Sequence, residues 1–114
     1  MSLDYARDNL ADAVRLLATS DDPLAVRLQA AWDGPVSNLW EKPCLTVDLL
    51  REFRDLWREY TAPSDDRTST GLRGLSHDEA GAAVHGVVGL LMGTTLAAAQ
   101  SDGSTRLATL ADLA

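Results

Sequence analysis

Two histidines and one cysteine are the side chains in this chain that could most readily act as metal ligands, proton carriers or nucleophiles. A metal site on a helix needs a second ligand three or four residues from the first, but those positions around His85 hold only glycine, alanine and valine. His77 and Asp78 lie too far along the same segment to complete a site. We therefore predict no metal site, and we expect His85 to satisfy a hydrogen bond in the core.

The single cysteine, Cys44, stands just before Thr46, where a helix is expected to start. A helix N-terminus can lower the pKa of a thiol, but no histidine or basic residue at a motif spacing supports a nucleophile here. A buried, inert thiol is the expectation. The chain also lacks a phosphate-binding loop and a dinucleotide fingerprint. The sequence therefore predicts no catalytic residue and no cofactor, and it gives no positive sign of an enzyme.

The most specific pattern is a row of small residues. Gly81, His85, Gly89 and Gly93 recur every four residues along one inclined row of a helix, and bulky valines and leucines fall mostly on the other side. Such a flat side lets another helix approach closely. That helix could belong to this chain, to a partner protein or to a second copy. Alternatively, the glycines reflect composition, because the absence of isoleucine and the single lysine beside nine arginines indicate a GC-rich bacterial genome.

A second hypothesis treats the missing side chains as space for a ligand. In that case Trp57, Tyr60, His85 and Met92 line a pocket between helices, which binds a small molecule or supports a weak enzyme. A cavity of a few hundred Å³ beside His85 would favour this hypothesis. A filled core with an exposed apolar patch would favour protein interaction instead.

Helical periodicity marks the segments that must position these residues. They are residues 3–18, 24–32, 47–60 and about 77–100, with a last short helix capped by Thr105. Ser76 and Glu79 form a capping box before a run from Ala80 to Ala99 that has no charged residue. This run is apolar on every side, so we expect the helix either to be buried centrally or to span a membrane. The sequence thus predicts an all-α bundle of four to five helices around a glycine/alanine-rich central helix.

The connections follow from turn residues. Asp33-Gly34-Pro35 is expected to stop the second helix, and residues 36–45 should form a loop or helical turn with Trp40 packed inward. Residues 61–75 should be the longest loop. A length of 114 residues suits one domain, so residues 1–114 are expected to form a single helical unit.

Charge narrows the range of partners. A net charge of −7 disfavours nucleic acid, and the acids interleaved with arginines in residues 47–60 suggest a solvated face. Residues 80–99 are long enough to span a membrane, but glycine and alanine insert weakly and no Lys or Arg cluster flanks them. With no recognisable signal peptide, we expect a cytoplasmic protein. The function expected is non-enzymatic protein–protein interaction, either self-association as a homodimer or accessory, antitoxin-like partner binding.

Overall fold

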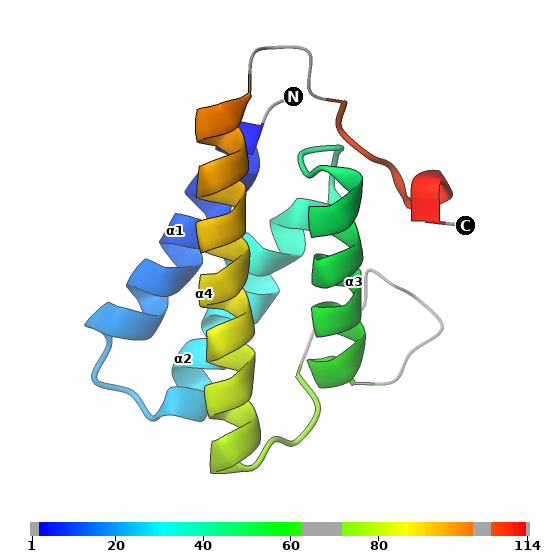
Figure 1. The fold of residues 1–114 in the computed structure, drawn as a ribbon. Coiled ribbons are helices and arrows are strands. Elements are labelled where there is room, and N and C mark those ends of the chain that lie inside the picture. The colour runs from blue at the N-terminus through cyan, green and yellow to red at the C-terminus, as the bar shows by residue number, and fades with distance from the viewer. Residues whose placement is uncertain (1–2, 63–71, 102–105, 114) are drawn as a thin grey trace.

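The computed structural model describes residues 3–62, 72–101 and 106–113, and within them the chain is an all-α bundle (Figure 1). Its four α-helices are α1 (Leu3–Thr19), α2 (Leu24–Ala31), α3 (Val47–Tyr60) and α4 (His77–Gln100). Three short helical turns accompany them: η1 (Trp32–Val36), η2 (Ser37–Trp40) and η3 (Leu110–Leu113). The only sheet-like pairing among the described residues is an isolated bridge between Thr61 and Leu72. The predicted fold class is therefore confirmed.

Local capping chemistry sets where α3 and α4 begin. The Thr46 hydroxyl accepts a hydrogen bond from the Leu49 amide at 3.5 Å. The Ser76 hydroxyl accepts one from the Glu79 amide at 3.1 Å, and the Glu79 carboxylate accepts one in return from the Ser76 amide at 3.0 Å. Because these bonds satisfy amides that have no partner inside the helix, both predicted starts are correct.

The second helix ends just before Asp33-Gly34-Pro35, as predicted. The α-helix ends at Ala31, but the chain continues through the wide π-helical turn η1 and the 3-10 turn η2. Gly34 leaves helical geometry, with φ −99° and ψ −105°, and this local bend accommodates Pro35, which lacks an amide hydrogen. The continuing turns bury Trp32 and Val36 fully and bring Trp40 inward.

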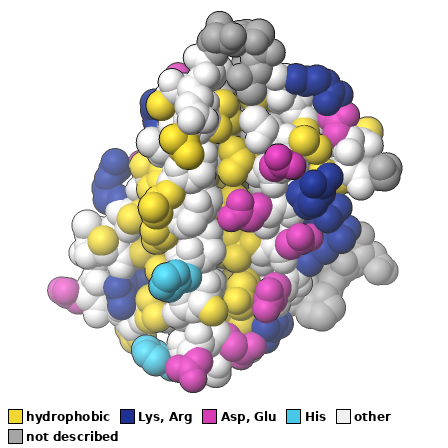
Figure 2. Space-filling view, in the orientation of Figure 1, with side chains coloured by type: hydrophobic (Ala, Val, Ile, Leu, Met, Phe, Trp, Pro, Cys, Tyr) yellow, Lys and Arg dark blue, Asp and Glu magenta, His cyan; other side chains and the backbone are white. Residues whose placement is uncertain are grey.

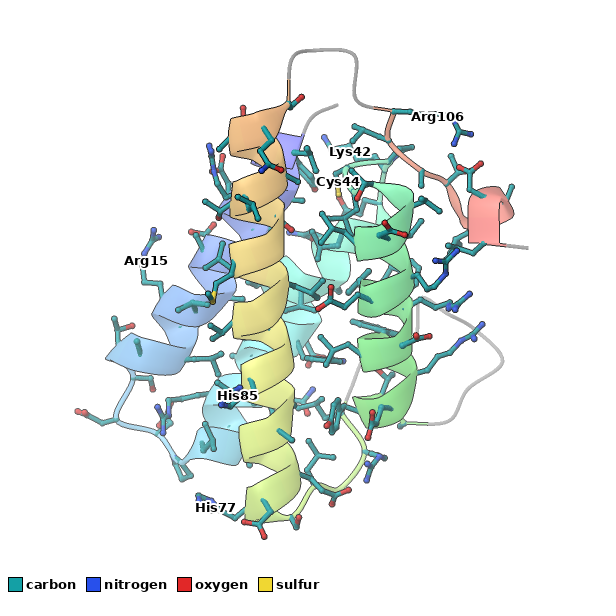
Figure 3. The ribbon with its side chains drawn as sticks, in the orientation of Figure 1. Arg15, Lys42, Cys44, His77, His85 and Arg106 are labelled. Carbon is teal, nitrogen blue, oxygen red and sulfur yellow. The ribbon has the colours of Figure 1, made fainter. Side chains whose placement is uncertain are left out.

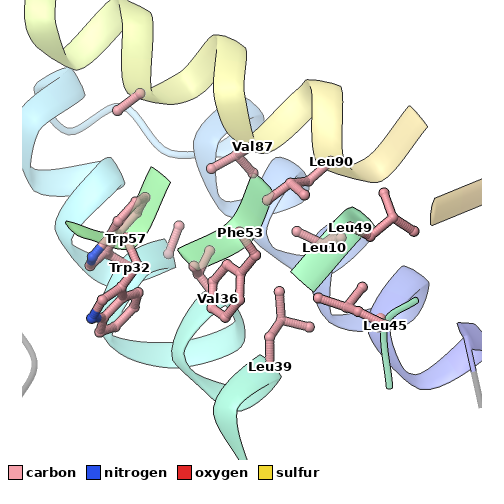
Figure 4. Close-up of a cluster of buried hydrophobic side chains, with 14 of the residues drawn as sticks. Leu10, Trp32, Val36, Leu39, Leu45, Leu49, Phe53, Trp57, Val87 and Leu90 are labelled. Atoms are coloured by element: carbon pink, nitrogen blue, oxygen red, sulfur yellow. The ribbon is translucent and has the colours of Figure 1, made fainter. Parts of the chain in front are cut away.

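Aromatic packing joins this helical run to α3 (Figure 4). The rings of Trp32 and Trp57 stack with centroids 5.3 Å apart, and Trp40 packs on Phe53 with centroids 4.6 Å apart. The indole N–H of Trp32 donates a hydrogen bond to the Thr61 hydroxyl at 2.9 Å, so the fully buried indole keeps its polar atom satisfied. These contacts fix the position of α3 in the bundle.

α4 lies against α1, α2 and α3, but it is not enclosed (Figure 1). Its inner side buries Ala80, Ala83, Val87, Leu90 and Thr94. Its outer side is exposed, with 67% of Met92 and 59% of Leu96 accessible to solvent. α4 is therefore less buried than its apolar sequence predicts, because α1 and α3 flank this helix without covering its outer side.

Two remaining predictions fall partly on undescribed residues. Of the predicted 61–75 loop, residues 63–71 lie outside the described part, and so does Thr105, the proposed last cap. The described end of the chain folds back onto the start of α3, where the Ala108 amide donates a hydrogen bond to the Leu45 carbonyl at 2.8 Å. Only Leu110–Leu113 is helical there.

Candidate interaction face

The glycine side of α4 is partly occupied by α3. A Cβ atom added at Gly86 would overlap Leu56 Cδ1, and one added at Gly93 would lie 3.1 Å from Leu49 Cδ2. At these two points the missing side chains permit a close crossing of helices within the chain. Part of the glycine pattern therefore serves the fold.

The predicted row does not pack as one surface against another described helix of this chain. Of its four members, Gly93 packs on α3, whereas Gly81 has no described atom within 4 Å of an added Cβ. Gly89 has only the Glu52 carboxylate in range, 3.9 Å away. The His85 side chain is exposed on the outer side of α4 (Figure 3), so its expected role in the core is wrong. The reason is geometric: its position on the helix lies opposite the buried Val87 and Leu90.

We define the outward strip as the residues on the exposed side of α4 at alternating spacings of three and four. They are Ala82, His85, Gly89, Met92 and Leu96, all of them exposed. The strip holds no Asp, Glu, Lys or Arg, in a chain whose net charge is −7. Its two large apolar side chains, Met92 and Leu96, are one turn apart and face solvent.

Acidic side chains run along one edge of this strip. We define the acidic row as four α3 residues at spacings of four, three and four: Asp48, Glu52, Asp55 and Glu59, all exposed. In Figure 2 acidic side chains lie along the α3 side of α4, and basic ones lie farther out. The Glu52 carboxylate marks the border, because it is the group nearest to Gly89 of the strip.

The acidic row is only partly neutralised. Asp48 pairs with Arg51 at 3.5 Å, and Asp55 pairs with Arg54 at 3.2 Å, in both cases at the surface. Glu52 and Glu59 form no ion pair with a described residue. The sequence predicts a solvated face for these acids, and their helical spacing already puts them on one side of α3. The sequence does not show that this side of α3 lies beside α4.

The predicted ligand pocket does not form from its four residues. Trp57 and Tyr60 are only 5% and 7% exposed, and both rings pack against Trp32. His85 and Met92 lie on the outer side of α4 instead. The aromatic cluster fills the space that the hypothesis assigned to a ligand, so these residues do not line one enclosed cavity.

A pocket of about 340 Å³ lies elsewhere, between the 39–45 segment and the described C-terminal segment. Cys44 is among its lining residues, but the thiol is only 1% exposed. Burial raises its pKa to about 11, and the nearby Lys42 ammonium lowers it less than burial raises it. The thiol is therefore protonated near neutral pH, as the sequence led us to expect of a buried, unreactive cysteine.

Two further features of the described residues bear on function. No three His, Cys, Asp or Glu side chains are grouped so that they could hold a metal ion. α4 is long and apolar enough to cross a membrane, judged by length and composition alone. This is weak evidence, because core helices of soluble proteins pass the same criterion, and α4 packs its inner side on the bundle.

Comparison of the chain with protein-family models, with curated proteins and with solved structures finds no match. The described features that bear most directly on function are the outward strip, the acidic row and the pocket beside Cys44.

Proposed function

We propose that this protein is a non-enzymatic binding module that holds a protein partner against the outward strip of α4. The observation that carries the proposal is the exposure of Met92 and Leu96 on a helix face that holds no Asp, Glu, Lys or Arg, in an acidic protein. Contiguous apolar surface of this kind is typical of interaction sites. Covering one large apolar side chain contributes about 1.5–3 kcal/mol, so these two residues could supply a substantial part of a binding free energy.

A membrane is the less favoured occupant of the same face. A helix that lies on an anionic lipid surface carries Lys and Arg on its polar side. Here the edge of the strip is an acidic row, which such a surface repels. We therefore propose that the protein acts in the cytoplasm on a protein partner.

The small-molecule alternative loses its original site, because His85 does not face a cavity shared with Trp57. The pocket beside Cys44 offers a buried thiol that is protonated near neutral pH and is therefore a weak nucleophile. Protein binding at α4 therefore has the stronger support.

The test uses a double substitution, Met92→Gln with Leu96→Gln, which removes apolar surface while keeping good helix formers. Val26→Gln is the matched control, because Val26 is 52% exposed on α2. Each immobilised protein is incubated with an extract of the native host, and bound proteins are identified. We expect the wild type and Val26→Gln to retain a shared partner that the double variant loses.

Circular dichroism and thermal melts establish that all three proteins are folded. Retention of the same partners by the double variant would refute the proposal, and so would the absence of any protein retained specifically by the wild type.

A further inference from the structure

We propose that the partner element is a basic amphipathic helix, lying along α4 with its apolar side on the outward strip and its cations facing the acidic row. This inference rests on the proposed function and specifies its partner. It follows from two features that lie side by side: the outward strip, which holds no Asp, Glu, Lys or Arg, and the acidic row along one of its edges. An amphipathic helix presents the complementary pair of surfaces.

The lengths of the two features agree. From Ala82 to Leu96 the strip covers fourteen helical steps, which is about 21 Å at 1.5 Å per residue. From Asp48 to Glu59 the acidic row covers eleven steps, about 16 Å. A partner helix of roughly 12–15 residues would span both features.

Charge specifies the cations more closely. Glu52 and Glu59 form no ion pair with a described residue, and they lie seven positions apart, two helical turns or about 10 Å. A partner helix packed nearly parallel or antiparallel to α3 would meet them with Lys or Arg residues that are also seven positions apart. The net charge of −7 would in addition accelerate the encounter with a cationic partner.

Gly89 suits this arrangement sterically. It lies in the strip beside the acidic row, and the only described atom near an added Cβ is the Glu52 carboxylate oxygen, 3.9 Å away. A residue without a side chain at this point lets a partner backbone approach closely while Met92 and Leu96 contact its apolar side.

A second copy of the chain fits less well. A two-fold pairing with antiparallel α4 helices turns the two acidic rows toward each other, which opposes association. A parallel pairing sets the acidic row opposite α1 of the other copy. There Arg7 and Arg15 are already paired with aspartates of their own helix, at 3.1 Å and 2.8 Å from Asp4 and Asp12.

The experiment uses two synthetic peptides of about 18 residues that differ only in charge. One is an amphipathic helix of Leu and Lys, and the other has Glu at every Lys position. Binding to the full chain is measured by fluorescence anisotropy over a range of salt concentrations. We expect the Lys peptide to bind, its affinity to fall as salt increases, and the Glu peptide to bind at least about tenfold more weakly.

Variants locate the site. Glu52→Gln with Glu59→Gln should weaken binding of the Lys peptide by about tenfold. Asp12→Asn with Asp21→Asn removes the same net charge from α1 and the loop after it, and should change affinity less than about twofold. Met92→Gln with Leu96→Gln should also weaken binding by about tenfold. Equal losses in the two charge variants would mean general attraction to an acidic protein and would overturn the inference.

Two other occupants give different results. A wild-type dimer in sedimentation that dissociates in the Met92→Gln, Leu96→Gln variant would identify a second copy, overturning the basic helix but leaving the proposed function intact. Binding to phosphatidylglycerol vesicles that depends on the same two residues would overturn both.

Discussion

Two glycines on α4 should respond in opposite ways to the same substitution. Gly89→Ala adds a methyl group where the nearest described atom is 3.9 Å away, so the packing cost is small. The replacement also removes the backbone freedom of glycine, which costs a helix about 0.5–1 kcal/mol relative to alanine. We expect Gly89→Ala to raise the free energy of unfolding by about that amount and the melting temperature by roughly 2–5 °C.

Gly86→Ala gains the same helical stability but forces Leu56 to move, because the new methyl overlaps Leu56 Cδ1. Overpacking typically costs about 1–3 kcal/mol, and the lower end applies because the overlapping atom is the tip of a flexible side chain. The net effect should be neutral to destabilising. Gly89→Ala should therefore exceed Gly86→Ala in stability by about 1–2 kcal/mol.

The assay is chemical denaturation of both variants, each also made in a Leu56→Ala background. Without the Leu56 side chain, Gly86→Ala should stabilise the protein about as much as Gly89→Ala does, since the overlap is gone. The reasoning would be refuted if Gly86→Ala were as stabilising as Gly89→Ala in the wild-type background. That result would mean that α3 does not pack closely on this glycine.

Three further outcomes follow from individual side chains. Thr94→Val should stabilise the fold by about 1 kcal/mol in denaturation experiments, because the buried Thr94 hydroxyl has no hydrogen-bond partner among the described residues; a loss of stability would reveal such a partner. Ser76→Ala should cost about 1 kcal/mol by opening the capping box with Glu79, and an unchanged melting temperature would argue against that cap. Near pH 8, Cys44 should react with iodoacetamide far more slowly in the native protein than in denaturant, because burial raises the pKa of this thiol to about 11. The same burial makes stability depend on pH. The contribution of the protonated thiol to the free energy of unfolding should be complete below the pKa of the unfolded thiol, near 9, and should be lost as the pH rises toward 11.

Helix positions could be predicted from sequence because the signals are local. Thr46 and Ser76 cap their helices through bonds that span three residues, and the apolar stripe of residues 47–60 repeats within one segment. The path after Ala31 could not be predicted in the same way. Gly34 and Pro35 interrupt the helix as predicted, but the short turns on either side of them depend on the tertiary packing of Trp32 and Val36.

The candidate site was harder to predict because its parts are set by how α3 and α4 pack. Small or apolar residues occur on all sides of α4, so the sequence does not show which side of this helix faces the core. That is why His85 was expected in the core. The spacing from Asp48 to Glu59 predicts a line of carboxylates, but the packing of α3 on the glycines of α4 is needed to show which edge of α4 that line follows.

The exposure of Gly89 leads to a last prediction, which connects stability with binding. Among the described residues only the Glu52 carboxylate comes near an added Cβ at Gly89, so this exposed helical glycine lowers stability without an evident gain in the isolated fold. A partner backbone at the strip would supply that gain. Gly89→Ala should then stabilise the protein and yet weaken binding of the Lys peptide by several-fold, because the methyl holds the peptide away from Met92 and the acidic row. Gly81→Ala is the matched control, since Gly81 is equally free of contacts but lies beyond the end of the strip at Ala82. It should stabilise the protein with little effect on binding. If both variants bind the peptide as the wild type does, Gly89 reflects the alanine- and glycine-rich composition of the chain, and a partner would contact the larger side chains of the strip without close approach of its backbone.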